Sequence, residues 1–152
     1  MKKLPKKYII VEIIPTNSNP LNGFIAQLQA LKVENDKIIE RLDLRVHDDL
    51  IDNEELLKII SYDKEMFNYS DKKEIMGIFK KFIGNNLLLI IDNDYTKSYL
   101  KDIKNKKESI FNYLGLKCSS VVFDELKEKY QLEPSNHFVD LLYEALIFEK
   151  NR

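Results

Sequence analysis

Cysteine is almost absent from this chain, and no apolar run is long enough to cross a membrane. The single cysteine, Cys118, excludes an internal disulfide and a cysteine-based structural zinc site. A basic N-terminal stretch precedes apolar residues, but Glu12 interrupts the apolar run and Pro15 ends it, which argues against a signal peptide. We therefore expect a cytoplasmic protein with no membrane contact.

Proline and glycine are also scarce, with four of each among 152 residues. No segment has the composition of a linker and no internal repeat is visible, so we expect one domain over residues 1–152. The 24 basic and 25 acidic residues leave a formal net charge of -1. Overall charge therefore neither favours nor excludes nucleic acid as a partner, and any basic surface must be local.

The first half of the chain has the pattern of three strands. Residues 8–14 are β-branched and almost continuously apolar, which is typical of a strand buried on both faces. Residues 24–33 and 38–46 alternate between apolar and polar side chains. Asn35 and Asp36 separate these two segments, and both residue types tolerate left-handed turn conformations, so the pattern predicts a hairpin.

The apolar spacing becomes helical from Asn53 onward. Residues 75–83 form the clearest helix, with Ser70 as the expected N-cap and Gly84 as the end. Residues 87–91 then predict a second buried strand, parallel to the first because a helix crosses between them. Three further helices are expected, at 95–104, 121–130 and 136–150, with one more strand possible after residue 107. This order predicts an α/β domain with a mixed five-stranded sheet, led by a hairpin and flanked by helices.

Three short motifs lie at the joints between these elements. Residues 12–16 read Glu-Ile-Ile-Pro-Thr, residues 92–100 read Asp-Asn-Asp-Tyr-Thr-Lys-Ser-Tyr-Leu, and His137 is followed five positions later by Leu142. In order and spacing the chain resembles the DEDDh 3′–5′ exonucleases, which have an RNase H-like fold and include the proofreading epsilon subunit of bacterial DNA polymerase III and RNase T. The corresponding family motifs are Asp-x-Glu-x-Thr, Asn-x-x-Phe-Asp-x-x-Phe-Leu, and His with Asp five residues later.

The resemblance implies a degenerate active site. Of the four family carboxylates only the first position keeps one, as Glu12, whereas the others are Ile14, Thr96 and Leu142. His137 matches the histidine that acts as general base in active members, and it could equally be a helix-start histidine bonded to the backbone. Glu12 and His137 are therefore expected to be vestigial catalytic residues.

Loss of these carboxylates has a direct physical consequence. Hydrolysis of this type uses two divalent cations about 3.5–4 Å apart, and hard cations such as Mg²⁺ need oxygen ligands. Glu12 alone would leave most of that charge unbalanced, so we expect no cofactor. Mg²⁺ or Mn²⁺ would bind only if Asp92 and Asp94 joined Glu12, although Asp94 is also well placed to cap the next helix. A buried Glu12 should face a cleft or meet a partner such as a lysine.

Three functions remain open from the sequence. The first is a nucleic-acid-binding module without hydrolysis, in which Thr16, Lys97, Lys101, Tyr95 and Tyr99 would contact a single strand. The lysines would otherwise form an ordinary solvated helix face. The second is a protein-interaction module whose partner could be a second copy of the chain. The alternative is an active metal-dependent 3′–5′ exonuclease with a rearranged site.

Overall fold

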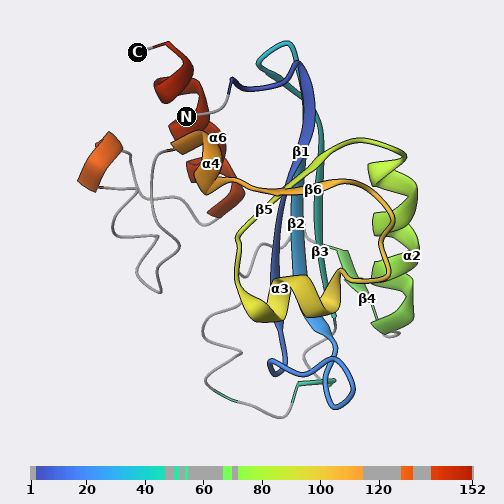
Figure 1. Ribbon diagram of the computed structural model, residues 1–152. Coiled ribbons are helices and arrows are strands. Elements are labelled where there is room, and N and C mark those ends of the chain that lie inside the picture. The colour runs from blue at the N-terminus through green and yellow to red at the C-terminus, as the bar shows by residue number, and fades with distance from the viewer. Residues whose placement is uncertain are drawn as a thin grey trace.

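The computed structural model describes residues 3–46, 50–51, 54, 67–69, 72–114, 128–131 and 138–151. Its sheet lies between α2 on one side and α6 on the other (Figure 1). The elements in chain order are β1 (Lys7–Pro15), β2 (Ile25–Glu34), β3 (Lys37–Val46), β4 (Phe67–Tyr69), α2 (Lys72–Ile83), β5 (Leu88–Ile90), α3 (Asp94–Tyr99), β6 (Lys107–Ser109), α4 (Phe111–Leu114) and α6 (Phe138–Lys150).

The sheet is mixed, and its strand order is β4-β3-β2-β1-β5-β6. β1, β2 and β3 are antiparallel neighbours, whereas β5 runs parallel to β1 and β6 runs parallel to β5. The hairpin-led mixed sheet expected from the sequence is therefore confirmed, including the strand after residue 107. The three-residue β4, which the sequence pattern did not indicate, pairs with the end of β3 and adds a sixth strand at one edge.

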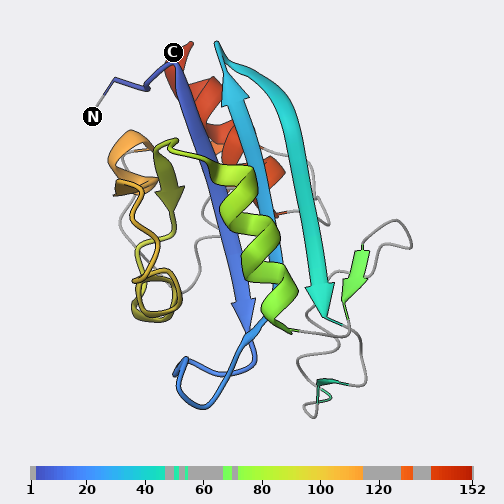
Figure 2. The same cartoon turned by 90° about the vertical axis from the view of Figure 1, so that its right-hand side faces the viewer.

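β1 is the centre of the core because apolar side chains cover both of its faces. Ile9, Val11 and Ile13 belong to an apolar layer that also contains the buried face of α2. Tyr8 and Ile10 point into a second layer, which contains α4 and the buried face of α6. Figure 2 shows α2 lying across the sheet, with α6 behind it. The predicted strand buried on both faces is confirmed, and the two layers fix which side chains of β1 share a face.

Backbone conformation explains two of the chain reversals. Asn35 and Asp36 have φ values of 49° and 66°, the left-handed pair that a two-residue hairpin turn between β2 and β3 requires. Gly84 follows α2 with φ of 52°, a conformation that glycine adopts at low cost and that ends the helix. The expected hairpin turn and the expected helix end at Gly84 are both confirmed.

Several helix boundaries differ from the sequence pattern or fall outside the description. The helix expected at 95–104 is shorter, because α3 ends at Tyr99. α6 is described from Phe138, so its expected start at 136 and His137 lie outside the described residues. Most of the expected 121–130 helix, most of the helical stretch after Asn53, and Ser70 also lie outside them. No helix within the described ranges has the length and apolar character of a membrane span.

Candidate functional site

Glu12 is the only charged side chain within the apolar centre of β1. Tyr8 and Ile10 point toward α6, and strand alternation places Glu12 in the same row, whereas Ile14, at the irregularity before Pro15, packs on the α2 side. The residue as a whole is partly exposed, but its Oε2 atom is buried and meets no hydrogen-bond partner. Burial raises the pKa of Glu12 from 4.5 to about 8. Glu12 is therefore mostly a neutral carboxylic acid at neutral pH. The sequence predicted that it would face a cleft or meet a partner such as a lysine, and among the described residues Oε2 has no hydrogen-bond partner.

A row of polar side chains extends from Glu12 across the sheet. Glu12 is paired with Gln29 on β2, which is paired in turn with Asp43 on β3. Gln27 and Arg45 form the next pair on the same face. Gln27, Gln29 and Arg45 are all buried, and the Arg45 Nε atom donates to the Val46 carbonyl at 3.3 Å. The α6 side of the sheet is therefore lined by polar side chains near the carboxyl end of β1.

The positions that the resemblance assigns to the other carboxylates are built into the core. Ile14 packs, partly buried, against the α2 layer. Thr96 is buried in α3, where its backbone N–H donates to the Asn93 side chain. Leu142 is 0% exposed in the α6 layer. Two of the three positions therefore present only hydrocarbon, and the third presents a buried hydroxyl.

Thr16 and Tyr99 hold the loop that follows β1. The Phe24 backbone N–H donates to the Thr16 hydroxyl at 3.0 Å, and the Tyr99 hydroxyl donates to the Asn17 carbonyl at 2.9 Å. Burial raises the pKa of Tyr99, and a hydrogen bond with the Thr16 side chain lowers it. Tyr95 and Tyr99 both pack, partly buried, against the α2 layer. These aromatic rings and the Thr16 hydroxyl contribute to local structure whatever else they bind.

The acidic residues after β5 have other partners. Asp92 forms an ion pair with Lys97, with its Oδ1 atom 2.6 Å from the Lys97 Nζ atom. Asn93, and not Asp94, is the N-cap of α3, because its side chain accepts from the Thr96 N–H at 2.9 Å. The expectation that Asp94 caps the helix was therefore wrong, since Asp94 lies within the first turn. There its carboxylate still favours the helix through the positive end of the helix dipole.

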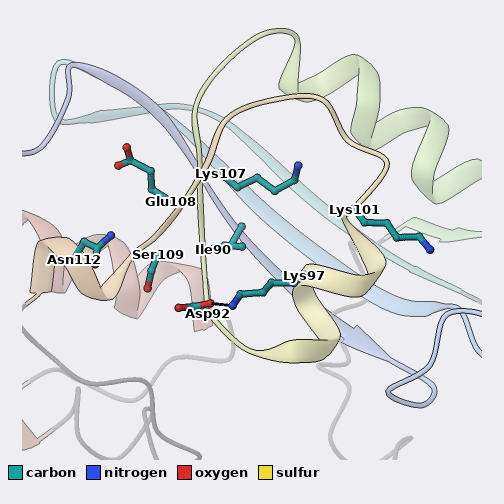
Figure 3. A pocket seen from close by; sticks show the side chains of 8 residues that line it. All are labelled: Ile90, Asp92, Lys97, Lys101, Lys107, Glu108, Ser109 and Asn112. Atoms are coloured by element: carbon teal, nitrogen blue, oxygen red, sulfur yellow. Dashed lines mark ion pairs between the residues drawn. The ribbon is translucent and has the colours of Figure 1, made fainter.

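A pocket of ≈ 400 Å³ opens where the parallel strands β5 and β6 end (Figure 3). Asp92 lines it after β5, Lys97 from α3, Lys101 just beyond α3, residues 107–109 from β6, and Asn112 from α4. Figure 3 shows the Lys97 ammonium directed at Asp92, with Ser109 and Asn112 across the pocket. The carboxyl ends of parallel strands are a common position for ligand sites in α/β sheets.

Comparison with known proteins relates this geometry to nucleases. The chain matches a solved structure described as Exonuclease X in complex with 5′ overhanging duplex DNA, with a TM-score of 0.63, 15% sequence identity, and coverage of 95% of this chain and 91% of that chain. It also matches the zinc-bound E. coli ExoI–ssDNA complex, with a TM-score of 0.60, 12% identity, and coverage of 97% of this chain and 40% of that chain. This chain has an RNase H-like exonuclease fold. No family model and no curated protein sequence matches it.

Side chains that could ligate a metal are sparse among the described residues of this fold. No group of three or more histidine, cysteine or acidic side chains lies close enough together among the described residues to hold a metal. Glu12 is a single carboxylate with a raised pKa, and Leu142 has no ligand atom. Asp92 is turned toward Lys97. The arrangement around Glu12 suits neutral hydrogen bonding better than binding of a highly charged metal pair.

Sequence reasoning missed the polar side chains of β2 and β3 in this exonuclease fold. Gln27 and Gln29 alternate with apolar residues, and so do Asp43 and Arg45, a pattern that is equally typical of a solvated sheet face. The only available signal was that helices follow these strands in the chain, because each helix must pack on one face of the sheet. Which face is covered depends on tertiary packing.

Proposed function

We propose that this chain is a DEDDh-type exonuclease homologue that has lost two-metal hydrolysis and binds single-stranded nucleic acid. The observation that carries the proposal is core packing at positions expected to hold metal ligands. Leu142 is 0% exposed within an apolar layer, and burial keeps Glu12 largely protonated. A site of this kind lacks the negative charge that two dications require.

Two divalent cations bring about four positive charges to one site, and several carboxylates normally offset them. Glu12 offers at most one negative charge, and its pKa of about 8 leaves it mostly uncharged at neutral pH. Thr96 could add only a neutral hydroxyl. The net positive charge would remain uncompensated in a buried position, which is strongly unfavourable.

Nucleic acid is the partner that the fold and the surface favour together. Both solved structures named above carry DNA in their descriptions. Lys97 and Lys101 are exposed at the carboxyl end of the sheet, where their ammonium groups can reach phosphate oxygens. Because Tyr95 and Tyr99 are partly committed to the core, we assign most of the binding to phosphate contacts and less to stacking.

The experiment combines binding and hydrolysis on the same purified protein. Labelled single-stranded DNA and RNA are incubated with the wild-type protein and Mg²⁺ or Mn²⁺, with Glu12→Ala as the matched variant. We expect no shortening of either strand, and binding in fluorescence anisotropy that weakens as salt concentration rises.

Two results would contradict the proposal in different ways. Metal-dependent shortening that disappears in Glu12→Ala would establish an active exonuclease with a rearranged site. Absence of salt-dependent binding to either strand would refute nucleic-acid binding and leave a protein partner as the better account. Measuring the mass of the purified protein in its native state would then reveal whether that partner is a second copy of the chain.

A further inference from the structure

The pocket at the ends of β5 and β6 is a different place from the Glu12 region. Ile90, which lines the pocket, belongs to the apolar layer on the α2 side of the sheet. Glu12 follows Tyr8 and Ile10 onto the α6 side. Asn112 also lines the pocket and comes from α4, which packs on the α6 side, so the lining comes from elements on both faces of the sheet, and Glu12 is not part of it.

The ammonium groups around this pocket outnumber the carboxylates. Lys97, Lys101 and Lys107 line it together with Asp92 and Glu108. Glu108 also forms an ion pair at 3.2 Å with Lys106, which does not line the pocket, and it accepts a hydrogen bond from the Tyr113 hydroxyl. The lining itself carries three lysines and two acids, which gives a net charge of +1. Lysines in such a lining attract an anion.

Neutral donors complete the lining. The Ser109 Oγ atom accepts from the Phe111 backbone N–H at 3.3 Å, which leaves its own hydroxyl proton able to point into the pocket. Asn112 is exposed at the pocket wall and can offer its side-chain N–H groups. In Figure 3 these two side chains lie on the other side of the Asp92 carboxylate from Lys97. Lys97 therefore has to turn away from Asp92 before donors from both sides can surround one compact anionic group.

The existing ion pair does not prevent such a ligand from binding. The side chains of Lys97 and Asp92 are 58% and 39% exposed, so their ion pair contributes little to stability and exchanges readily with solvent. Lys97 can turn toward a ligand without unfolding any element, because lysine is a long and flexible side chain. Lys107, in contrast, donates to the Ile103 and Asn105 carbonyls and holds the wall of the pocket in place.

We propose that this pocket binds a phosphomonoester. A phosphomonoester carries about -1.5 to -2 charges at neutral pH and three acceptor oxygens, which suit a lining of net positive charge with several hydrogen-bond donors. The volume of ≈ 400 Å³ admits a phosphate with a sugar-sized substituent. No aromatic ring is among the described residues of the lining, so the site recognises the phosphate and not a base. The group can come from a free nucleotide or from the phosphorylated end of a strand.

The test uses titration calorimetry on the full chain with inorganic phosphate, adenosine 5′-monophosphate and adenosine. The site variant is Lys97→Ala with Lys101→Ala, and the matched control is Lys80→Ala with Lys81→Ala, which removes the same charge from exposed positions on α2. We expect phosphate and the monophosphate to bind and adenosine not to bind. The site variant should weaken binding by about tenfold or more, because charge-assisted hydrogen bonds are lost, and the control should not.

A second arm identifies the source of the phosphate. A short oligothymidylate is compared with and without a 5′-phosphate. Tighter binding of the phosphorylated strand, abolished in the site variant, would assign the site to strand ends; equal binding of the two strands, with the monophosphate response retained, would assign it to free nucleotides. The proposal is overturned if phosphate and the monophosphate fail to bind, or if the control weakens binding as much as the site variant. These results do not depend on whether hydrolysis is lost.

Discussion

Replacement of Glu12 by glutamine tests the electrostatics of the candidate site directly. Glutamine has nearly the shape of the protonated glutamic acid and cannot ionise. Burial raises the pKa of Glu12 from 4.5 to about 8, so the folded protein holds this proton more tightly than the unfolded chain does. The contribution of Glu12 to the free energy of unfolding should therefore be fully present below about pH 4.5 and should be lost as pH rises toward 8.

The size of the effect follows from the pKa difference. One pKa unit corresponds to about 1.36 kcal/mol, so a rise from 4.5 to about 8 implies a loss on the order of 3–5 kcal/mol between about pH 5 and pH 9. Most of this loss is present by about pH 7, where the unfolded chain is fully ionised at this position. The Glu12→Gln protein lacks this dependence, since no proton is exchanged at the site.

Urea unfolding followed by circular dichroism measures both proteins at about pH 5, 7 and 9. Other titrating groups are common to the two proteins and cancel in the difference. We expect the two free energies of unfolding to be similar near pH 5 and the variant to be more stable by several kcal/mol near pH 9. A difference between the proteins that stays constant over this range would refute the assignment of Glu12 as a buried neutral acid. A wild type that gains stability with pH relative to the variant would show that Glu12 has a charged partner.

Three further predictions concern packing around the site. Leu142→Ala should lower the free energy of unfolding by about 2–5 kcal/mol in urea titrations, because Leu142 is 0% exposed, and a change under 1 kcal/mol would contradict its place in the core. Gly23→Ala should lower the free energy of unfolding by about 1–3 kcal/mol, since the new Cβ would lie 2.6 Å from the Tyr99 hydroxyl oxygen. Adding Tyr99→Phe to Gly23→Ala should recover part of this loss, as measured by calorimetric melting. Arg41→Ala should cost about 1 kcal/mol through loss of the two hydrogen bonds to Asp140, at 3.1 and 2.5 Å, and the cost should shrink at high salt.

The interactions of Asp140 and Leu142 show how this fold uses its last helix. Asp140 lies in the first turn of α6 and pairs with Arg41 on β3, which ties the helix to the sheet at its start. Tyr143 donates from its hydroxyl to the Asp36 carbonyl at 2.6 Å, which ties the middle of the helix to the hairpin. Leu142, between these two, fills the apolar layer. α6 therefore holds the sheet through contacts at its start and in its middle.

The local sequence predicted those features that depend on a few neighbouring residues. Asn35 and Asp36 indicated the hairpin turn, Gly84 indicated the end of α2, and both conformations are present. The continuous apolar pattern of residues 8–14 indicated a central strand, which β1 confirms. These predictions succeed because backbone conformations with positive φ, and burial on both faces of a strand, restrict the residue types strongly.

Predictions that depend on competition between nearby groups were less reliable. Asn93 takes the capping position that Asp94 was expected to occupy, since both side chains accept hydrogen bonds well and only the entry angle of the chain selects one. The helix at 95–104 ends early at Tyr99, whose hydroxyl reaches the loop after β1. The roles expected for His137 lie outside the described residues, and the nucleic-acid contacts of Thr16, Lys97 and Lys101 stay predictions.

From the residues alone came the α/β class and the hairpin-led mixed sheet, because periodicity and side-chain chemistry are properties of the chain itself. The loss of carboxylates at Ile14, Thr96 and Leu142 stays an expectation from the family resemblance. Only the tertiary structure decided that the Glu12 Oε2 atom is buried without a hydrogen-bond partner among the described residues, that Gln29 and Asp43 continue its row, and that lysines of three segments line one pocket. The physical reason is that burial and charge proximity depend on which distant segments are packed together. The sequence of a single strand or helix does not determine which distant segments pack against it.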